Sequence, residues 1–98
     1  MRFDIKAEAL ADLENIYAYG LSEHGIERAE NYLARLRAQF DRLIEFPKLG
    51  PQAVGLRQNL RFWKFEQHHI YYRATATSVT IVRILHHAMN AAARLTGG

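Results

Sequence analysis

The hydrophobic periodicity of the chain changes near residue 47, and this change constrains the fold more than any other feature. Before it, apolar residues recur at steps of three and four, the spacing of one helix face. After it come runs of aromatic and β-branched residues, which are typical of strands. The pattern predicts a first helix through Leu10, Leu13, Ile16, Tyr17 and Leu21, and a second over residues 26–46.

A polar stretch flanked by glycines separates the two predicted helices. We interpret residues 22–24, between Gly20 and Gly25, as a turn. Pro47 ends the second helix because proline cannot continue one. Two amphipathic helices joined by a short turn pack as an antiparallel hairpin.

The remaining segments predict a sheet. Residues 2–6 alternate apolar and polar side chains, as a half-buried strand does. A loop over residues 47–55 leads to three strand-like runs, over residues 57–66, 69–74 and 79–85, and residues 88–95 form a short C-terminal helix or an arm. We therefore predict an α+β fold. Its helical hairpin packs on one face of a mainly antiparallel sheet, made of the N-terminal strand and a three-stranded meander.

Length and composition favour a single cytoplasmic domain over residues 1–98. A chain of this length holds one core, and its 49% hydrophobic content is enough to fold without disulfides. It has no cysteine, and no apolar run approaches the ~20 residues that cross a bilayer. Because the sequence has no phosphate-binding glycine loop and no nucleophile elbow, we expect no cofactor and no metal.

The charge is distributed unevenly along the chain. Residues 1–50 carry seven Lys/Arg against nine Asp/Glu, a net charge of −2. Residues 51–98 carry six Lys/Arg against the single acid Glu66, a net charge of +5. This asymmetry predicts an acidic partner, either nucleic acid or a negatively charged protein segment.

Basic and aromatic residues interleave in the predicted meander, a mixture that holds phosphates and stacks bases in nucleic-acid-binding proteins. Strand alternation supports a second interpretation, in which Trp63 and Phe65 face the helices and the cations solubilise the outer face. Arg83 interrupts a run apolar enough for a central strand, so it is either paired internally or open to a ligand. The cations are Arg57, Arg61, Lys64, Arg73 and Arg83.

Histidines are the candidate acid-base groups. His86 and His87 end the last predicted strand, where an imidazole can transfer protons near neutral pH or hold the structure by hydrogen bonds. Adjacent strand residues face opposite ways, so this pair does not hold one metal ion. His68 and His69 fall at a predicted turn, where we expect them to be solvated.

Two patterns on the helices favour structural roles. Arg28, Arg35 and Arg42 recur every seven residues and predict a solvated basic stripe opposite the apolar one. The helical aromatic residues are interpreted as core and hairpin contacts, namely Tyr17, Tyr19, Tyr32 and Phe40.

Nearly the whole chain resembles the ParE toxins of the ParE/RelE superfamily of type II toxin-antitoxin systems. The order, spacing and end-to-end coverage of several short segments make the resemblance specific. These segments are residues 11–19 (ADLENIYAY), 25–32 (GIERAENY), 46–50 (FPKLG), 56–57 (LR), 69–73 (HIYYR) and 82–90 (VRILHHAMN).

The resemblance implies a toxin that a cognate antitoxin neutralises by wrapping the hairpin and sheet, and that poisons DNA gyrase when free. It favours a protein that acts by binding over an enzyme. We expect the antitoxin to contact Tyr17, Leu21, Arg57, Arg73 and Arg83.

The related RelE toxins imply an alternative, a ribosome-dependent endonuclease of messenger RNA. His86 would then be the acid-base group, and Arg73 and Arg83 would hold the phosphate. The chain lacks the dense lysine and arginine set of those nucleases, which favours the gyrase interpretation. An inactive relative that only binds an antitoxin is the third class left open.

Overall fold

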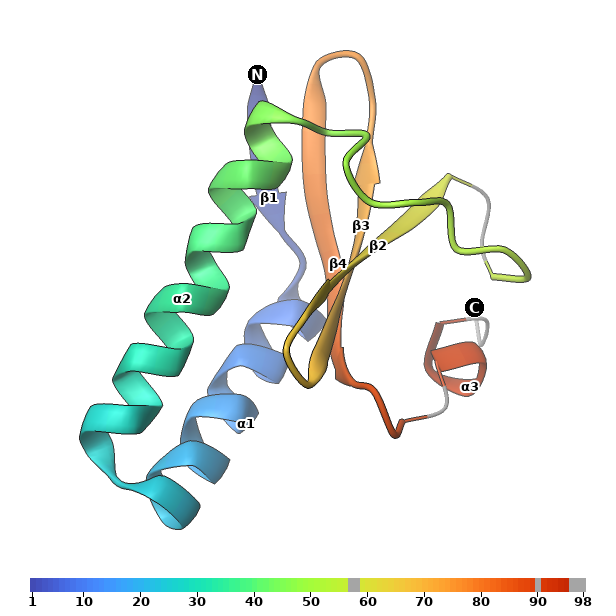
Figure 1. Ribbon diagram of the computed structural model, residues 1–98. Coiled ribbons are helices and arrows are strands. Elements are labelled where there is room, and N and C mark those ends of the chain that lie inside the picture. Colours follow the sequence, from blue (N-terminus) through green and yellow to red (C-terminus); the bar gives the residue numbers. More distant parts are fainter. Residues whose placement is uncertain (57–58, 90, 96–98) are drawn as a thin grey trace.

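The computed structural model describes residues 1–56, 59–89 and 91–95, which form a four-stranded sheet with helices on both faces (Figure 1). The predicted α+β architecture is confirmed. Its elements, in chain order, are β1 (Arg2–Ile5), α1 (Ala7–His24), α2 (Ile26–Glu45), β2 (Leu60–Phe65), β3 (His68–Ala74), β4 (Ser78–His86) and α3 (Ala91–Leu95).

The strand order is β1-β4-β3-β2, so the last strand lies in the sheet interior beside the first. β4 pairs with β1 in parallel and with β3 antiparallel, and β3 pairs with β2 antiparallel. The sheet is therefore mainly antiparallel, as predicted. β1 reaches only as far as the pair Ile5 and Ile81, which leaves the rest of one β4 edge without a strand partner.

The helical hairpin is tighter than the sequence pattern predicts. α1 continues through residues 22–24, so the polar turn predicted there is wrong. The chain reverses at Gly25 alone, whose φ of 86° suits a residue without a Cβ. Gly20 lies inside α1, where an added Cβ would stand 3.1 Å from the Ala29 Cβ. Gly20 thus allows the two helices to approach closely rather than ending the first.

The main core lies between the hairpin and the inner face of the sheet. Trp63 and Phe65 pack against this cluster, as strand alternation predicts. The fully buried members include Leu36 and Leu43 from α2 and Ile70, Tyr72 and Ile81 from the sheet. Burial of these side chains, at ~25 cal/mol per Å² of apolar surface, is the main force that holds the two layers together.

A second core covers the outer face of the sheet, which the sequence interpretation assigned to solvated cations alone. There Tyr71, Val82 and Leu85 pack with Leu95 of α3, which is 1% exposed. The C-terminal segment is thus a short helix rather than an arm, and α3 lies on the face opposite the hairpin (Figure 1). The sequence interpretation considered the cations of this face but not the apolar residues Tyr71 and Leu85 that pack there.

Tyr72 of β3 holds the loop between α2 and β2 in place by hydrogen bonds. The buried Tyr72 hydroxyl donates a hydrogen bond to the Pro47 carbonyl and accepts one from the Gly50 N–H, both at 2.9 Å. Beyond the loop, β2 begins at Leu60, and residues 57 and 58, where the strand was predicted to start, lie outside the described ranges. Within these ranges no helix has the length and apolarity to cross a membrane.

Candidate functional site

Arg83 is paired internally, which is one of the two alternatives that the sequence leaves open. Its Nε and Nη2 donate to the two Asp12 carboxylate oxygens at 2.8 and 2.9 Å. The backbone N–H of Ile84 donates to the same carboxylate at 2.9 Å, on the β4 edge that β1 does not reach. The hydrogen bonds to Asp12 raise the pKa of the Arg83 guanidinium further. Asp12 therefore already satisfies this cation.

The other two residues of the predicted nuclease set lie at opposite ends of the sheet. Arg73 is the cross-strand partner of Thr80, whereas His86 is the partner of His68. The five-residue offset between Arg73 and His68 along β3 corresponds to roughly 17 Å at ~3.3 Å per residue. His86 Nδ1 accepts a hydrogen bond from the Ala88 N–H at 3.1 Å, which is a structural contact. One phosphate does not reach both Arg73 and His86.

The predicted antitoxin contacts fall on two separate surfaces. Tyr17 is half-buried and Leu21 is 39% exposed, and their spacing of four residues places them on one face of α1. Arg73 lies on the outer face of β3, and its side chain forms no ion pair with the described residues. Arg57 lies outside the described residues. Arg61, on the inner face, donates to the Gly50 carbonyl at 2.7 Å.

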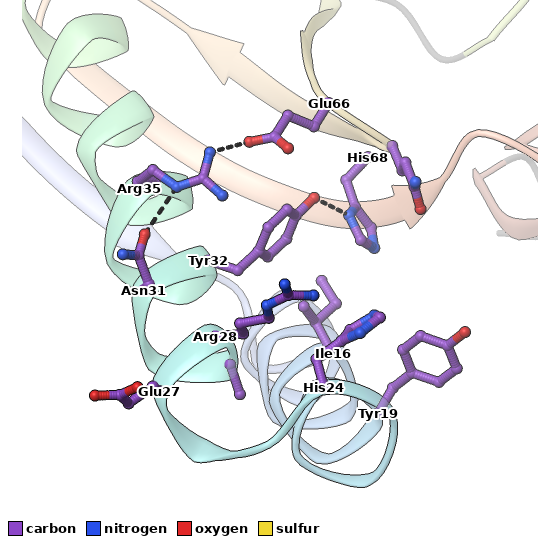
Figure 2. Close-up of a pocket in the computed structure, with 13 residues that line it drawn as sticks. Ile16, Tyr19, His24, Glu27, Arg28, Asn31, Tyr32, Arg35, Glu66 and His68 are labelled. Carbon is purple, nitrogen blue, oxygen red and sulfur yellow. Dashed lines mark hydrogen bonds and ion pairs between the residues drawn. The ribbon is translucent and has the colours of Figure 1, made fainter.

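A hollow of about 870 Å³ opens at the end of the hairpin, between α1, α2 and the β2–β3 turn (Figure 2). Its size is within the range of small-molecule and peptide sites. It is lined by Ile16, Tyr19, Gly20, His24, Glu27, Arg28, Ala29, Asn31, Tyr32, Arg35, Glu66, Gln67 and His68. We define these residues as the hairpin hollow.

A hydrogen bond between Tyr32 and His68 forms one wall of the hairpin hollow. The Tyr32 hydroxyl lies 2.6 Å from His68 Nδ1. Burial, and then the imidazoles of His86 and His87, lower the pKa of His68 to about 4. His68 is therefore neutral at pH 7, and the imidazole tautomer decides which of the two groups donates the hydrogen bond. The prediction that His68 lies solvated in a turn is wrong, because His68 is the first residue of β3.

The arginine stripe of α2 is exposed, as predicted, and two of its members also contact aromatic residues of β2. Arg35 forms an ion pair with Glu66, the one acid of the basic half, and its guanidinium lies 5.7 Å from the Phe65 ring centroid. Arg42 lies 6.0 Å from the Trp63 ring centroid. Such contacts between cations and ring faces add ~0.5–1 kcal/mol at exposed positions.

The helical aromatic residues divide between core and surface. Phe40 is buried and Tyr32 packs against the core, in agreement with the sequence interpretation. Tyr19 is 66% exposed beside the hairpin hollow, so the interpretation of this residue as a core contact is wrong. Among the described residues, no three His, Asp or Glu side chains are placed to share a metal ion.

Sequence reasoning did not find the hairpin hollow as a site. Its walls come from residues 16–35 and 66–68, which only the folded chain brings together. The seven-residue spacing of Arg28 and Arg35 was the available signal, but spacing alone does not show that Arg35 meets Glu66.

Comparison with known proteins identifies a consistent set of relatives. The family model for the ParE toxin of the type II toxin-antitoxin system parDE matches residues 3–91. Toxin ParE1 of Caulobacter vibrioides is 33% identical over 93 residues, which cover 95% of this chain and 96% of that protein. Toxin ParE1 of Mycobacterium tuberculosis is 30% identical over 90 residues, with 91% and 92% covered.

A solved structure has the same fold. It is a chain of the chromosomal ParDE TA system from P. aeruginosa, with a TM-score of 0.77 over 88% of this chain and 95% of that one. At 22% identity, this likeness concerns the fold alone. The matched family range includes both helices of the hairpin and all four strands except Arg2, the first residue of β1.

Proposed function

The chain belongs to the ParE toxin family of type II toxin-antitoxin systems, and from this membership we propose that it poisons DNA gyrase when no antitoxin is bound. In this proposal the chain inhibits gyrase by binding to it and catalyses no reaction itself. It also implies a cytoplasmic location, since gyrase acts on the chromosome.

The observation that carries the choice of binding over cleavage is the dispersal of the predicted nuclease residues. Arg83 is occupied by Asp12, and Arg73 and His86 lie at opposite ends of the β3–β4 ladder. Phosphodiester cleavage requires an acid-base group and a charge-stabilising group at one phosphate. Inhibition by binding has no such requirement.

The experiment adds the purified chain to gyrase and plasmid DNA. Supercoiling should fall and linear DNA should accumulate, and prior mixing with the antitoxin from the adjacent gene should abolish both effects. Gyrase that is unaffected by a molar excess of the chain would refute the proposal.

A ribosome-dependent endonuclease of messenger RNA is the second candidate, favoured by a lysine and a histidine that lie side by side on the sheet. Lys64 of β2 and His69 of β3 are cross-strand partners, and burial, and then Lys64 and His87, lower the pKa of His69. New 5′ ends in a message translated with the chain, absent without ribosomes, would support this candidate over the first.

We further propose that a cognate antitoxin neutralises the toxin by covering the Tyr17 and Leu21 face of α1 and the outer face of the sheet. Leu21 is exposed in the free chain and Arg73 has no ion-pair partner among the described residues, so both are available to a partner. Arg57 and Arg83 remain predicted contacts. An acidic segment would have to compete with Asp12 for Arg83.

A further inference from the structure

Exposed apolar side chains gather at the end of the hairpin. Tyr19 is 66% exposed, Leu21 39% and Ile26 60%, within eight consecutive positions at the turn between α1 and α2. Tyr19 lines the hairpin hollow, whereas Leu21 lies two positions further along α1 and points to another side of the helix. Tyr19 is therefore the exposed apolar side chain that belongs to the hollow.

Arg28 supplies an unpaired positive charge to this surface. Its guanidinium points into the hairpin hollow, between the side chains of Tyr32, Ile16 and His24 (Figure 2). No described residue forms an ion pair with it. The neighbouring Arg35 differs, because Glu66 neutralises it. The carboxylate of Glu27 is directed away from Arg28 (Figure 2).

We propose that the hairpin hollow binds a carboxylate side chain from an acidic amphipathic segment of the antitoxin. Arg28 pairs with the carboxylate, while Tyr19 contacts an apolar residue that flanks it. This inference rests on the proposed function, because it takes the antitoxin as the occupant of the hollow. It adds a contact to those proposed at Tyr17 and Leu21. A carboxylate fits because a guanidinium binds it through two parallel N–H donors.

The charges around the hollow argue against a nucleic acid as its occupant. A polyphosphate strand needs several cations along its path. Here Arg28 is the unpaired arginine of the described lining, because Glu66 neutralises Arg35. One carboxylate between apolar neighbours matches one cation between apolar side chains.

The first test uses a defined probe, a fluorescent peptide of about 14 residues with Leu and Glu at helical spacing, a length at which an isolated helix is marginal. Its control replaces every Glu with Lys. The wild-type chain should bind the acidic peptide at least about tenfold more tightly than the basic one. Arg28→Glu should reverse this preference.

Arg37 provides the matched control, since it is another exposed arginine of α2 but does not line the hollow. Arg37→Glu should keep the affinity for the acidic peptide within about twofold, as exposed charges contribute little. Tyr19→Ala removes no buried contact, and it should lower the affinity for the acidic peptide severalfold. Equal losses in Arg28→Glu and Arg37→Glu would overturn the proposal, as would a wild-type chain that binds neither peptide.

A second test separates the antitoxin from gyrase as the partner. Cells that express Arg28→Glu should stop growing even when the adjacent antitoxin gene is co-expressed, whereas the antitoxin should rescue cells that express Arg37→Glu. An Arg28→Glu chain that is harmless yet still binds the antitoxin would place a gyrase contact in the hollow and overturn the proposal. The peptide measurement involves no gyrase, so it still tests binding to the hollow if gyrase is not the target.

Discussion

Asp12 and Arg83 join the first helix to the central strand, with the Asp12 carboxylate 2.8 Å from Arg83 Nε and 2.9 Å from the Ile84 N–H. The pair lies where β1 has ended, so a side chain replaces the strand partner that β4 lacks there. The Arg83 and Asp12 side chains are 20% and 11% exposed, and this partial burial strengthens the interaction.

Replacement of Asp12 should therefore destabilise the fold. Asp12→Ala leaves the Arg83 charge and the Ile84 N–H without their acceptor, at a cost of about 3 kcal/mol in the free energy of unfolding. Urea denaturation measures this change. Glu14→Ala, at an exposed position of the same helix, should stay within about 0.5 kcal/mol of the wild type. Similar losses in the two variants would contradict this role of Asp12.

The hydrogen bond between Tyr32 and His68 should contribute measurably to stability. Tyr32→Phe removes one hydroxyl from a partly buried pair, and we expect a loss of about 1 kcal/mol in the free energy of unfolding. Tyr19→Phe removes a hydroxyl from a largely exposed residue and should change stability little. A Tyr32→Phe chain as stable as Tyr19→Phe would show that the hydrogen bond has no net effect.

His68 should make the fold sensitive to mild acid. Its folded-state pKa of about 4 lies below the ordinary value of 6.5, so the unfolded chain binds the proton more readily. The neutral imidazole stabilises the fold fully above pH 6.5, and this contribution is lost as the pH falls toward 4. The groups that act on it are His86, His87, Asp12 and Glu66. At ~1.4 kcal/mol per pKa unit the full shift corresponds to about 3.5 kcal/mol, and because His68 is only partly buried, solvent screening reduces the expected loss to about 1–2 kcal/mol.

Urea unfolding at pH 7 and pH 5 measures this effect. His68→Gln should reduce the difference in unfolding free energy between the two pH values, because it removes the titrating group. His24→Gln, at an exposed position of α1, should leave that difference as in the wild type. An unchanged pH dependence in His68→Gln would exclude His68 as its source.

The fold was predictable from the sequence in those segments where the spacing of hydrophobic residues indicates which side chains are buried. The two helix stripes and the alternation that buries Trp63 and Phe65 are local patterns, and the structure confirms them. The turn at residues 22–24 was wrong because local polarity does not reveal that Gly20 packs against Ala29. The placement of Arg83 was limited to two alternatives, since its partner Asp12 lies 71 residues earlier in the chain.

Gly50 should tolerate no side chain, for a reason unrelated to its backbone angles. A Cβ there would lie 2.2 Å from the Phe62 carbonyl oxygen and 2.9 Å from the Tyr72 hydroxyl. Gly50→Ala must therefore displace the loop from β2 and break the hydrogen bonds of Tyr72, and we expect a loss of about 3 kcal/mol. Thermal or urea unfolding measures it. Gly55→Ala meets no atom within 4 Å and bears only the cost of its positive φ, about 1 kcal/mol.

Arg73 provides the sharpest test of an antitoxin contact on the sheet. It shares the outer face of the sheet with Leu60, its cross-strand partner, and forms no ion pair with the described residues. Its charge is therefore available to an acidic partner at no cost to an existing pair. Arg73→Glu should weaken binding of the antitoxin from the adjacent gene by about tenfold, mainly through like-charge repulsion. Calorimetric titration at low and high salt measures this loss, which should shrink as salt screens the charge. Arg37→Glu carries the same charge change on α2 and should bind normally, so an equal loss in both variants would exclude a specific contact at Arg73.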